Sequence, residues 1–113
     1  MSDLAGYRQV RLAQNQTLFR SVNERVDKVV QHFATDGPIG FVCECADREC
    51  GRLIDLPHEE YEAIRQNPTH FLVLRDHVYS EVEIVVDDRD RYVVVEMFGA
   101  GSRVAAASNP RRN

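Results

Sequence analysis

Hydrophobic residues recur at helical spacing in the first third of the chain. Between residues 15 and 33 the apolar positions follow one another at intervals of three or four residues, at Phe19, Val22, Val26, Val29 and Phe33. This spacing places them on one face of an α-helix. Gly37 and Pro38 come next, and glycine readily takes the left-handed conformation that ends a helix. We predict a helix over 15–33 whose apolar face packs on the protein's own sheet. A homodimer formed through this helix is the alternative.

Alternating positions then predict a β-hairpin followed by a second, shorter helix. Residues 39–45 read as a strand and residues 52–56 as its antiparallel return, with a polar turn between them. Pro57 suits the first position of a helix, and acidic residues follow it in the first turn. We predict a helix over 57–66 that directs Tyr61 and Ile64 inward.

Three more apolar runs complete the predicted sheet. Residues 71–74, 82–86 and 92–97 are rich in β-branched residues, and an acidic turn separates the last two runs. Such a pair favours a hairpin, although a short helix over 80–86 is an alternative. The fold class is therefore α+β, with a long N-terminal helix and a shorter middle helix on a small, mainly antiparallel sheet.

The two ends of the chain show little pattern. Residues 1–13 read as a flexible lead-in, and residues 99–113 are too small and polar to bury much area. We expect a disordered tail over 99–113 and a single domain over 14–98.

Charge and composition exclude several classes of protein. The net charge is −4 with 14 basic residues, and the arginines are interleaved with acids, whereas nucleic-acid binding relies on clustered basic residues. No apolar run approaches the length of a membrane span or a signal peptide core, so we expect a cytoplasmic protein. Seven acidic residues lie around the cysteines and the middle helix, and we expect them to form a solvated rim. The alternative is a docking surface for a basic partner. The residues are Glu44, Asp47, Glu49, Asp55, Glu59, Glu60 and Glu62.

Three cysteines lie within eight residues, in the arrangement Cys43-x-Cys45-x4-Cys50. Thiolates are strong ligands of Zn²⁺, and structural zinc takes four ligands in a tetrahedron. Strand alternation puts Cys43 and Cys45 on one side, and the turn can return Cys50 over them. The fourth ligand must be another residue type. We favour His77, in a polar loop after a predicted strand, over His58, His70, water or Asp47.

Other readings of the cysteines compete with zinc. They can be inert core residues, as buried cysteines often are. They can also form a redox switch in which Cys45 pairs with Cys50. An iron–sulfur cluster normally needs a fourth thiolate, and the sequence has only three cysteines.

The same segments resemble a group of short uncharacterised actinobacterial proteins. The shared pattern is F-x-C-E-C-x4-C, then E-Y-E, a histidine and Y-V-V-V-E, and it covers roughly residues 14–97 here. In that group the histidine after the Phe-containing strand accompanies the cysteines, so the resemblance implies His77 as the fourth ligand. It implies no activity.

Catalytic signatures are absent from the sequence. It lacks the His-x-Glu and Pro-Cys-x-x-Cys motifs of zinc deaminases and the His-Glu-x-x-His motif of metalloproteases. We therefore predict a non-enzymatic interaction or regulatory module with a structural Cys3His zinc and a protein partner. A thiol-based redox sensor that releases zinc on oxidation is one alternative, and a small zinc enzyme with an open coordination position is another.

Overall fold

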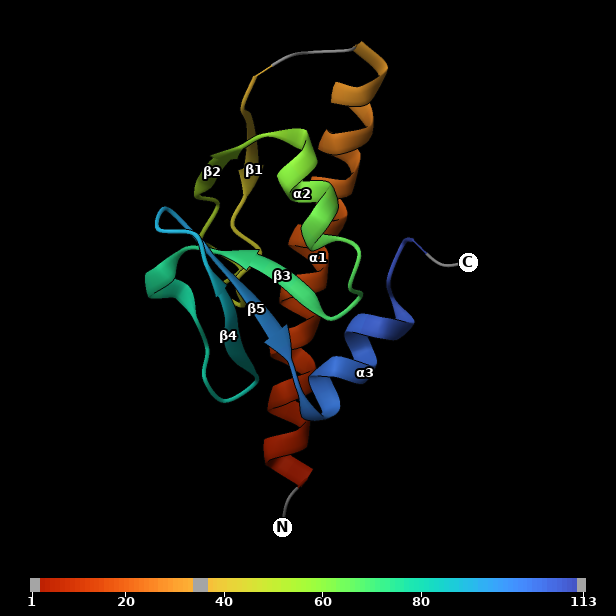
Figure 1. Cartoon of the computed structure of the whole chain (residues 1–113). Helices are drawn as coiled ribbons and strands as arrows, with labels where there is room; N and C mark the ends of the chain where they lie inside the picture. The colour runs from red at the N-terminus through yellow and green to blue at the C-terminus, as the bar shows by residue number, and fades with distance from the viewer. Residues whose placement is uncertain (1–2, 34–36, 112–113) are drawn as a thin grey trace.

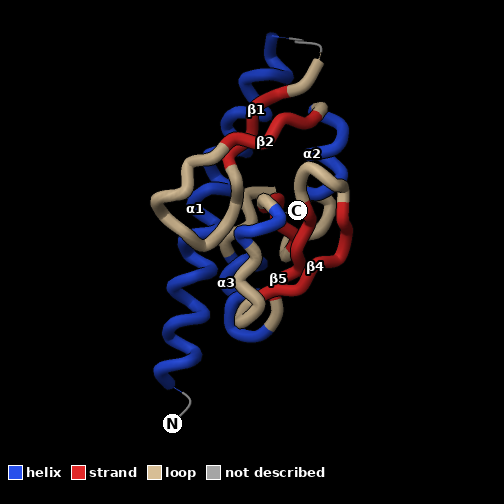
Figure 2. The backbone as a smooth tube through the Cα atoms, turned by 90° about the vertical axis from the view of Figure 1, so that its left-hand side faces the viewer, coloured by secondary structure: helices blue, strands red, loops and turns tan. Residues whose placement is uncertain are grey.

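Helix α1 (Asp3–Phe33) runs along the whole molecule and carries the other elements on one side (Figures 1 and 2). The computed structural model describes residues 3–33 and 37–111. Beside α1 lie the hairpin of β1 (Ile39–Val42) and β2 (Leu53–Leu56), and the short helix α2 (His58–Ile64). The fold class is α+β, as the sequence predicts.

The second sheet is antiparallel and has three strands in the order β3–β5–β4. Strand β3 (His70–Val73) leads into a 3₁₀ turn, η1 (Arg75–His77), and β4 (Glu83–Asp88) forms a hairpin with β5 (Val93–Met97). The register pairs Phe71 with Val95 and Val85 with Val95. The predicted hairpin is confirmed, and the alternative of a short helix over 80–86 is wrong.

The first hairpin is also confirmed, with a shorter first strand than predicted. Ile39 pairs with Leu56 and Val42 with Leu53, and the chain leaves the regular strand at Cys43. Gly37 has a φ of 93°, the left-handed conformation expected of a helix-ending glycine. Residues 34–36, which separate α1 from Gly37 in the sequence, lie outside the described residues.

The face that α1 buries differs from the predicted one. Val26 of the predicted apolar stripe packs against the hydrophobic core, but Val22, Val29 and Phe33 are 41%, 56% and 71% exposed, so most of the stripe does not pack on the sheet. The buried face carries mainly polar side chains at the same helical spacing, at Gln16, Arg20, Asn23, Glu24 and Asp27. The reason is that α1 lies against irregular backbone whose polar groups need hydrogen-bond partners. Homodimerisation through the exposed stripe stays a prediction.

Both ends of the chain are helical where the sequence predicts no structure. Helix α1 begins at Asp3, and α3 (Gly99–Ala107) follows β5 directly. Gly101 is buried against α1, where an added Cβ would lie 3.4 Å from the Cβ of Ala13. The small residues of this segment therefore permit close helix packing, which composition alone does not reveal. Residues 1–2 and 112–113 of the predicted lead-in and tail lie outside the described residues.

The hydrophobic core joins α2 and both sheets. The rings of Phe41 and Tyr61 stack with centroids 4.3 Å apart, and Phe71, Val95 and Leu56 are fully buried. Tyr61 and Ile64 point inward as predicted. Among the described residues, no helix has the length and apolar character to cross a membrane.

Candidate metal centre

The structure brings together the three cysteines and His77. One donor atom from each of Cys43, Cys45, Cys50 and His77 lies within 4.8 Å of the others. All three cysteines are free thiols. The group can therefore hold a metal ion, and its members are those expected from the sequence.

Three separate pieces of backbone supply these side chains. Cys43 and Cys45 follow the end of β1, Cys50 precedes β2, and His77 ends η1. The amide of Cys43 donates to the carbonyl of Arg52 at 2.8 Å, which extends the β1–β2 ladder. The amide of His77 donates to the carbonyl of Leu74 at 2.9 Å, so the 3₁₀ turn directs the imidazole back toward the hairpin.

The ligand-to-ligand distances fit a tetrahedral ion. The Nδ1 atom of His77 lies 3.3 Å from the Sγ of Cys50 and 3.7 Å from the Sγ of Cys43. Zinc bonds of about 2.3 Å to sulfur and about 2.0 Å to nitrogen separate the two atoms by about 3.5 Å along a tetrahedral edge. The donor set and these two distances are therefore compatible with a tetrahedral metal ion.

Backbone amides also point at the sulfur atoms. The amide of Leu74 donates to the Sγ of Cys43 at 3.2 Å, and that of Arg52 donates to the Sγ of Cys50 at 3.5 Å. A hydrogen bond from the Cys43 thiol, helped by a backbone hydrogen bond with Asp47 and by His77, lowers the pKa of Cys45 to about 5. The same pairing with Cys45, together with burial, raises the pKa of Cys43. At least one sulfur is thus available as a thiolate, the form that binds metal.

Helix α1 holds the cysteine loop with amide side chains. Asn23 accepts from the amide of Val42 at 2.7 Å and donates to the carbonyl of the same residue at 2.7 Å. Asn15 donates to the carbonyl of Ala46 at 2.8 Å, and Gln16 donates to the carbonyl of Glu44 at 3.4 Å. These contacts fix the backbone on both sides of Cys43 and Cys45.

Glu44 stands between the two cysteines and points the other way, into the core. Its carboxylate accepts from Asn23 Nδ2 at 2.8 Å, from the hydroxyl of Tyr61 at 2.9 Å and from the amide of Leu72 at 3.0 Å. Burial raises its pKa, and the hydrogen bonds from Asn23, Leu72 and Tyr61 oppose the shift. The prediction that Glu44 belongs to a solvated rim is wrong, because this side chain is 0% exposed.

The backbone of Glu44 links the two sheets. Its amide donates to the carbonyl of Leu72 in β3 at 2.7 Å, while its side chain reaches back to the amide of the same residue. The cysteine loop is therefore bound to the second sheet as well as to α1. Sequence reasoning missed Glu44 and Asn23; the one available signal was a set of polar residues at helical spacing within a long helix.

The other histidines have partners elsewhere. His58 Nδ1 lies 2.6 Å from Asp27, and His70 Nε2 lies 2.9 Å from Glu96. His32 is exposed and packs edge-on against Phe33. The geometry thus favours His77 over the other histidines that the sequence leaves open.

Asp27, His58 and Glu62 form a second group with metal-ligating side chains. The guanidinium of Arg111 already occupies this group, with donors 2.7 Å from Glu62, 2.8 Å from Glu24 and 3.3 Å from Asp27. The Asp27 carboxylate raises the pKa of His58, while burial raises the pKa of Asp27 itself. This group is an ion-pair network that joins α1, α2 and the segment after α3.

The chain matches no protein-family model, no curated protein and no solved structure. The resemblance to short actinobacterial proteins therefore stays a prediction, and the functional argument rests on the geometry of the site.

Proposed function

We propose that this protein is a non-catalytic interaction or regulatory module in which a structural Zn²⁺ bound by Cys43, Cys45, Cys50 and His77 pins the first hairpin to the second sheet. The observation that supports it most is the convergence of four protein donors at tetrahedral spacing. Structural zinc sites are closed by four protein ligands, whereas catalytic sites keep a position for water.

The donor set favours zinc over the harder divalent cations. Three thiols and an imidazole suit Zn²⁺, whereas Mg²⁺ and Ca²⁺ prefer oxygen ligands. The three cysteines are free, and thiols stay reduced in the cytoplasm. A cytoplasmic location therefore belongs to the proposal.

The metal would add stability to the cysteine segment, which lacks regular secondary structure. The two-stranded hairpin carrying the cysteines is marginal in isolation, and Cys43–Gly51 form no helix or strand. A bound ion would connect this irregular segment to η1, which follows β3 in the sequence. We infer that the ion holds the surface of the module in one conformation, which a recognition role requires.

Metal analysis of two matched histidine variants tests the proposal. Purified, reduced protein should carry about one zinc per chain, and its removal should lower the Tm by more than about 10 °C. His77→Gln should lose the metal on dialysis against a chelator. His70→Gln, which removes a histidine of similar burial outside the cluster, should retain it. Equal zinc content in the two variants would contradict the ligand assignment.

A redox-sensor role is the second candidate, and one observation favours it. Cys50 is only partly buried, and its sulfur lies within 4.8 Å of the sulfurs of Cys43 and Cys45, so an accessible thiol stands close to a partner for a disulfide. Low concentrations of peroxide should then release zinc with formation of an intramolecular disulfide. If zinc loss requires the same peroxide concentration that oxidises methionine, the sensor role fails and the structural role stands.

A further inference from the structure

Strand β4 lies at the edge of the three-stranded sheet and exposes a run of apolar residues. It pairs with β5 alone within residues 3–33 and 37–111. Ile84, Val85 and Val86 are 55%, 46% and 44% exposed. An exposed edge with β-branched side chains is a template for pairing with another strand.

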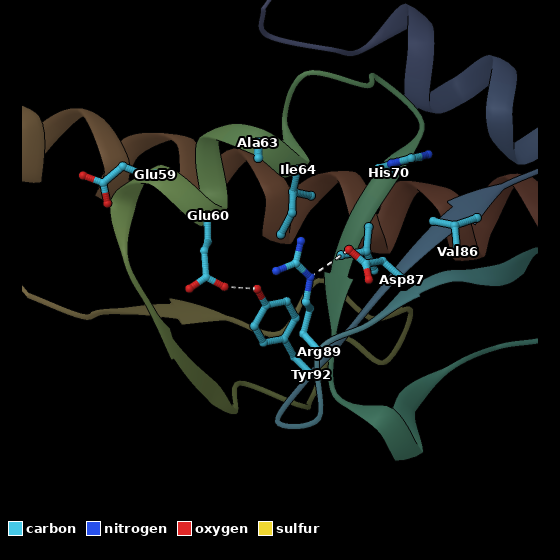
Figure 3. A pocket seen from close by; sticks show the side chains of 10 residues that line it. Glu59, Glu60, Ala63, Ile64, His70, Val86, Asp87, Arg89 and Tyr92 are labelled. Atoms are coloured by element: carbon cyan, nitrogen blue, oxygen red, sulfur yellow. Dashed lines mark hydrogen bonds and ion pairs between the residues drawn. The ribbon is translucent and has the colours of Figure 1, made fainter.

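A groove of about 490 Å³ opens beside this edge, between α2 and the sheet. Figure 3 shows Ala63 and Ile64 of α2 on one side of the groove and His70 and Val86 on the other. Val94 and Tyr92 also line it. The groove is thus apolar at its base and continuous with exposed Val86.

The rim of the groove is acidic. Glu59, Glu60 and Asp87 stand against a single arginine, Arg89. The Nε of Arg89 donates to Asp87 at 2.8 Å, and its guanidinium extends between Asp87 and Glu60 in Figure 3. Among the residues that the structure describes, the carboxylate of Glu60 accepts only from the neutral hydroxyl of Tyr92, at 2.6 Å. The rim therefore retains negative charge, and Arg89 shows that a guanidinium fits there.

The charges of β4 disfavour a second copy of this chain at the same edge. Antiparallel pairing of two copies centred on Asp87, or parallel pairing in register, would put Asp87 of one copy opposite Asp87 of the other. Like charges directly opposite destabilise paired strands. The register shift between Val85 and Asp87 also interrupts a regular ladder.

We propose that the β4 edge and the adjoining groove bind an extended segment of a partner protein that carries basic and apolar side chains on the same face. The segment adds a strand to β4 through backbone hydrogen bonds, its apolar side chains cover Ile84 and Val86, and a basic side chain enters the acidic rim. This inference rests on the proposed interaction function and names the partner's chemistry.

Titration of the zinc-loaded protein with synthetic peptides tests the proposal. The probe is a peptide of about eight residues, the length of a typical strand, in which Val and Arg take turns at every second position and Ser fills the positions between them. Amide NMR shifts should concentrate at residues 84–88 and 92–94. A peptide with Glu in place of Arg should bind at least about tenfold more weakly, because like charges across an interface are repelled. A peptide with N-methylated backbone amides should lose a similar factor, since strand addition depends on those donors.

A pair of lysine variants supplies the control. Val86→Lys places a charge on the exposed edge and should weaken peptide binding by at least about tenfold. Val29→Lys changes a valine of similar exposure on α1 and should bind as the parent does. Equal binding of the Arg and Glu peptides, equal binding by the two variants, or concentration-dependent dimerisation abolished by Val86→Lys would each overturn the proposal. Because both variants should keep about one zinc per chain, a failure here differs from a failure of the metal proposal.

Discussion

At the scale of single residues, the metal centre depends on a side chain that cannot bind the metal. Glu44 separates two of the cysteines in sequence and is fully buried on the opposite side of the loop. Its carboxylate satisfies donors from α1, α2 and β3. The alternation that directs Cys43 and Cys45 toward His77 therefore also directs Glu44 into a polar cage that fixes the loop.

Removal of this carboxylate should destabilise the protein strongly. Glu44→Ala removes the acceptor of the Tyr61 hydroxyl and of the Leu72 amide and one of the two acceptors of Asn23 Nδ2, and we expect a loss of about 3 kcal/mol in the free energy of unfolding. Urea denaturation measures it. The control is Glu49→Ala, an exposed glutamate in the same cysteine segment, which should change the free energy by less than about 0.5 kcal/mol. Similar values for the two variants would show that the cage is not needed.

At the scale of elements, α1 is the frame on which the hairpin is built. Its buried face offers amide and charged side chains to irregular backbone, while Val22, Val29 and Phe33 of its apolar stripe are exposed. Hydrophobic patterning predicts that Val22 contributes to stability and that the neighbouring Asn23 does not. The structure indicates the reverse.

Alanine at these two positions separates the interpretations. Asn23→Ala removes both hydrogen bonds to Val42 and one to Glu44, so we expect a loss of about 2–3 kcal/mol. Val22→Ala removes a half-exposed side chain and should cost less than about 0.5 kcal/mol. Chemical denaturation followed by circular dichroism gives both values. A larger loss of stability for Val22→Ala than for Asn23→Ala would support the predicted packing of the apolar stripe.

Sequence patterns could predict the elements and the cysteine cluster, because both depend on local spacing. The hairpins follow from alternation, and the three cysteines lie close together in sequence. The role of His77 is harder to predict, because its position beside the hairpin depends on the placement of β3 and η1. The buried face of α1 cannot be predicted from the pattern, because a polar stripe on a helix normally faces solvent. Helix α3 was missed because its small residues gain stability only through packing on α1.

At the scale of the whole molecule, the segment after α3 closes the fold. The guanidinium of Arg111 joins Glu24 and Asp27 of α1 to Glu62 of α2. The buried side chain of Arg65 adds contacts to Glu24 and Asn109. Elements from the two ends of the described chain and from its middle thus meet in one ion-pair network.

This network should give the protein a characteristic acid response. A hydrogen bond from Arg111 lowers the pKa of Glu62 from 4.5 to about 2. Because the folded pKa is depressed, the stabilisation is complete above pH 4.5 and is lost as the pH falls toward 2. Arg111→Gln should therefore lower the free energy of unfolding at neutral pH, and its difference from the parent should shrink below pH 4.5.

Urea denaturation across this pH range measures the difference directly. The control, Arg103→Gln, alters an exposed arginine of α3 and should give a curve parallel to the parent at every pH. If Arg111→Gln also runs parallel to the parent from neutral pH to pH 2, the ion pair with Glu62 contributes nothing to acid stability.

The central claim is that one ion is held by three sulfur atoms and one imidazole nitrogen. X-ray absorption at the zinc edge of the purified protein tests it most directly, because it counts the scatterers around the metal. We predict three sulfur atoms at about 2.3 Å and one light atom at about 2.0 Å that shows the multiple scattering of an imidazole ring. Absence of zinc, fewer than three sulfur atoms, or absence of the imidazole signal would contradict the claim.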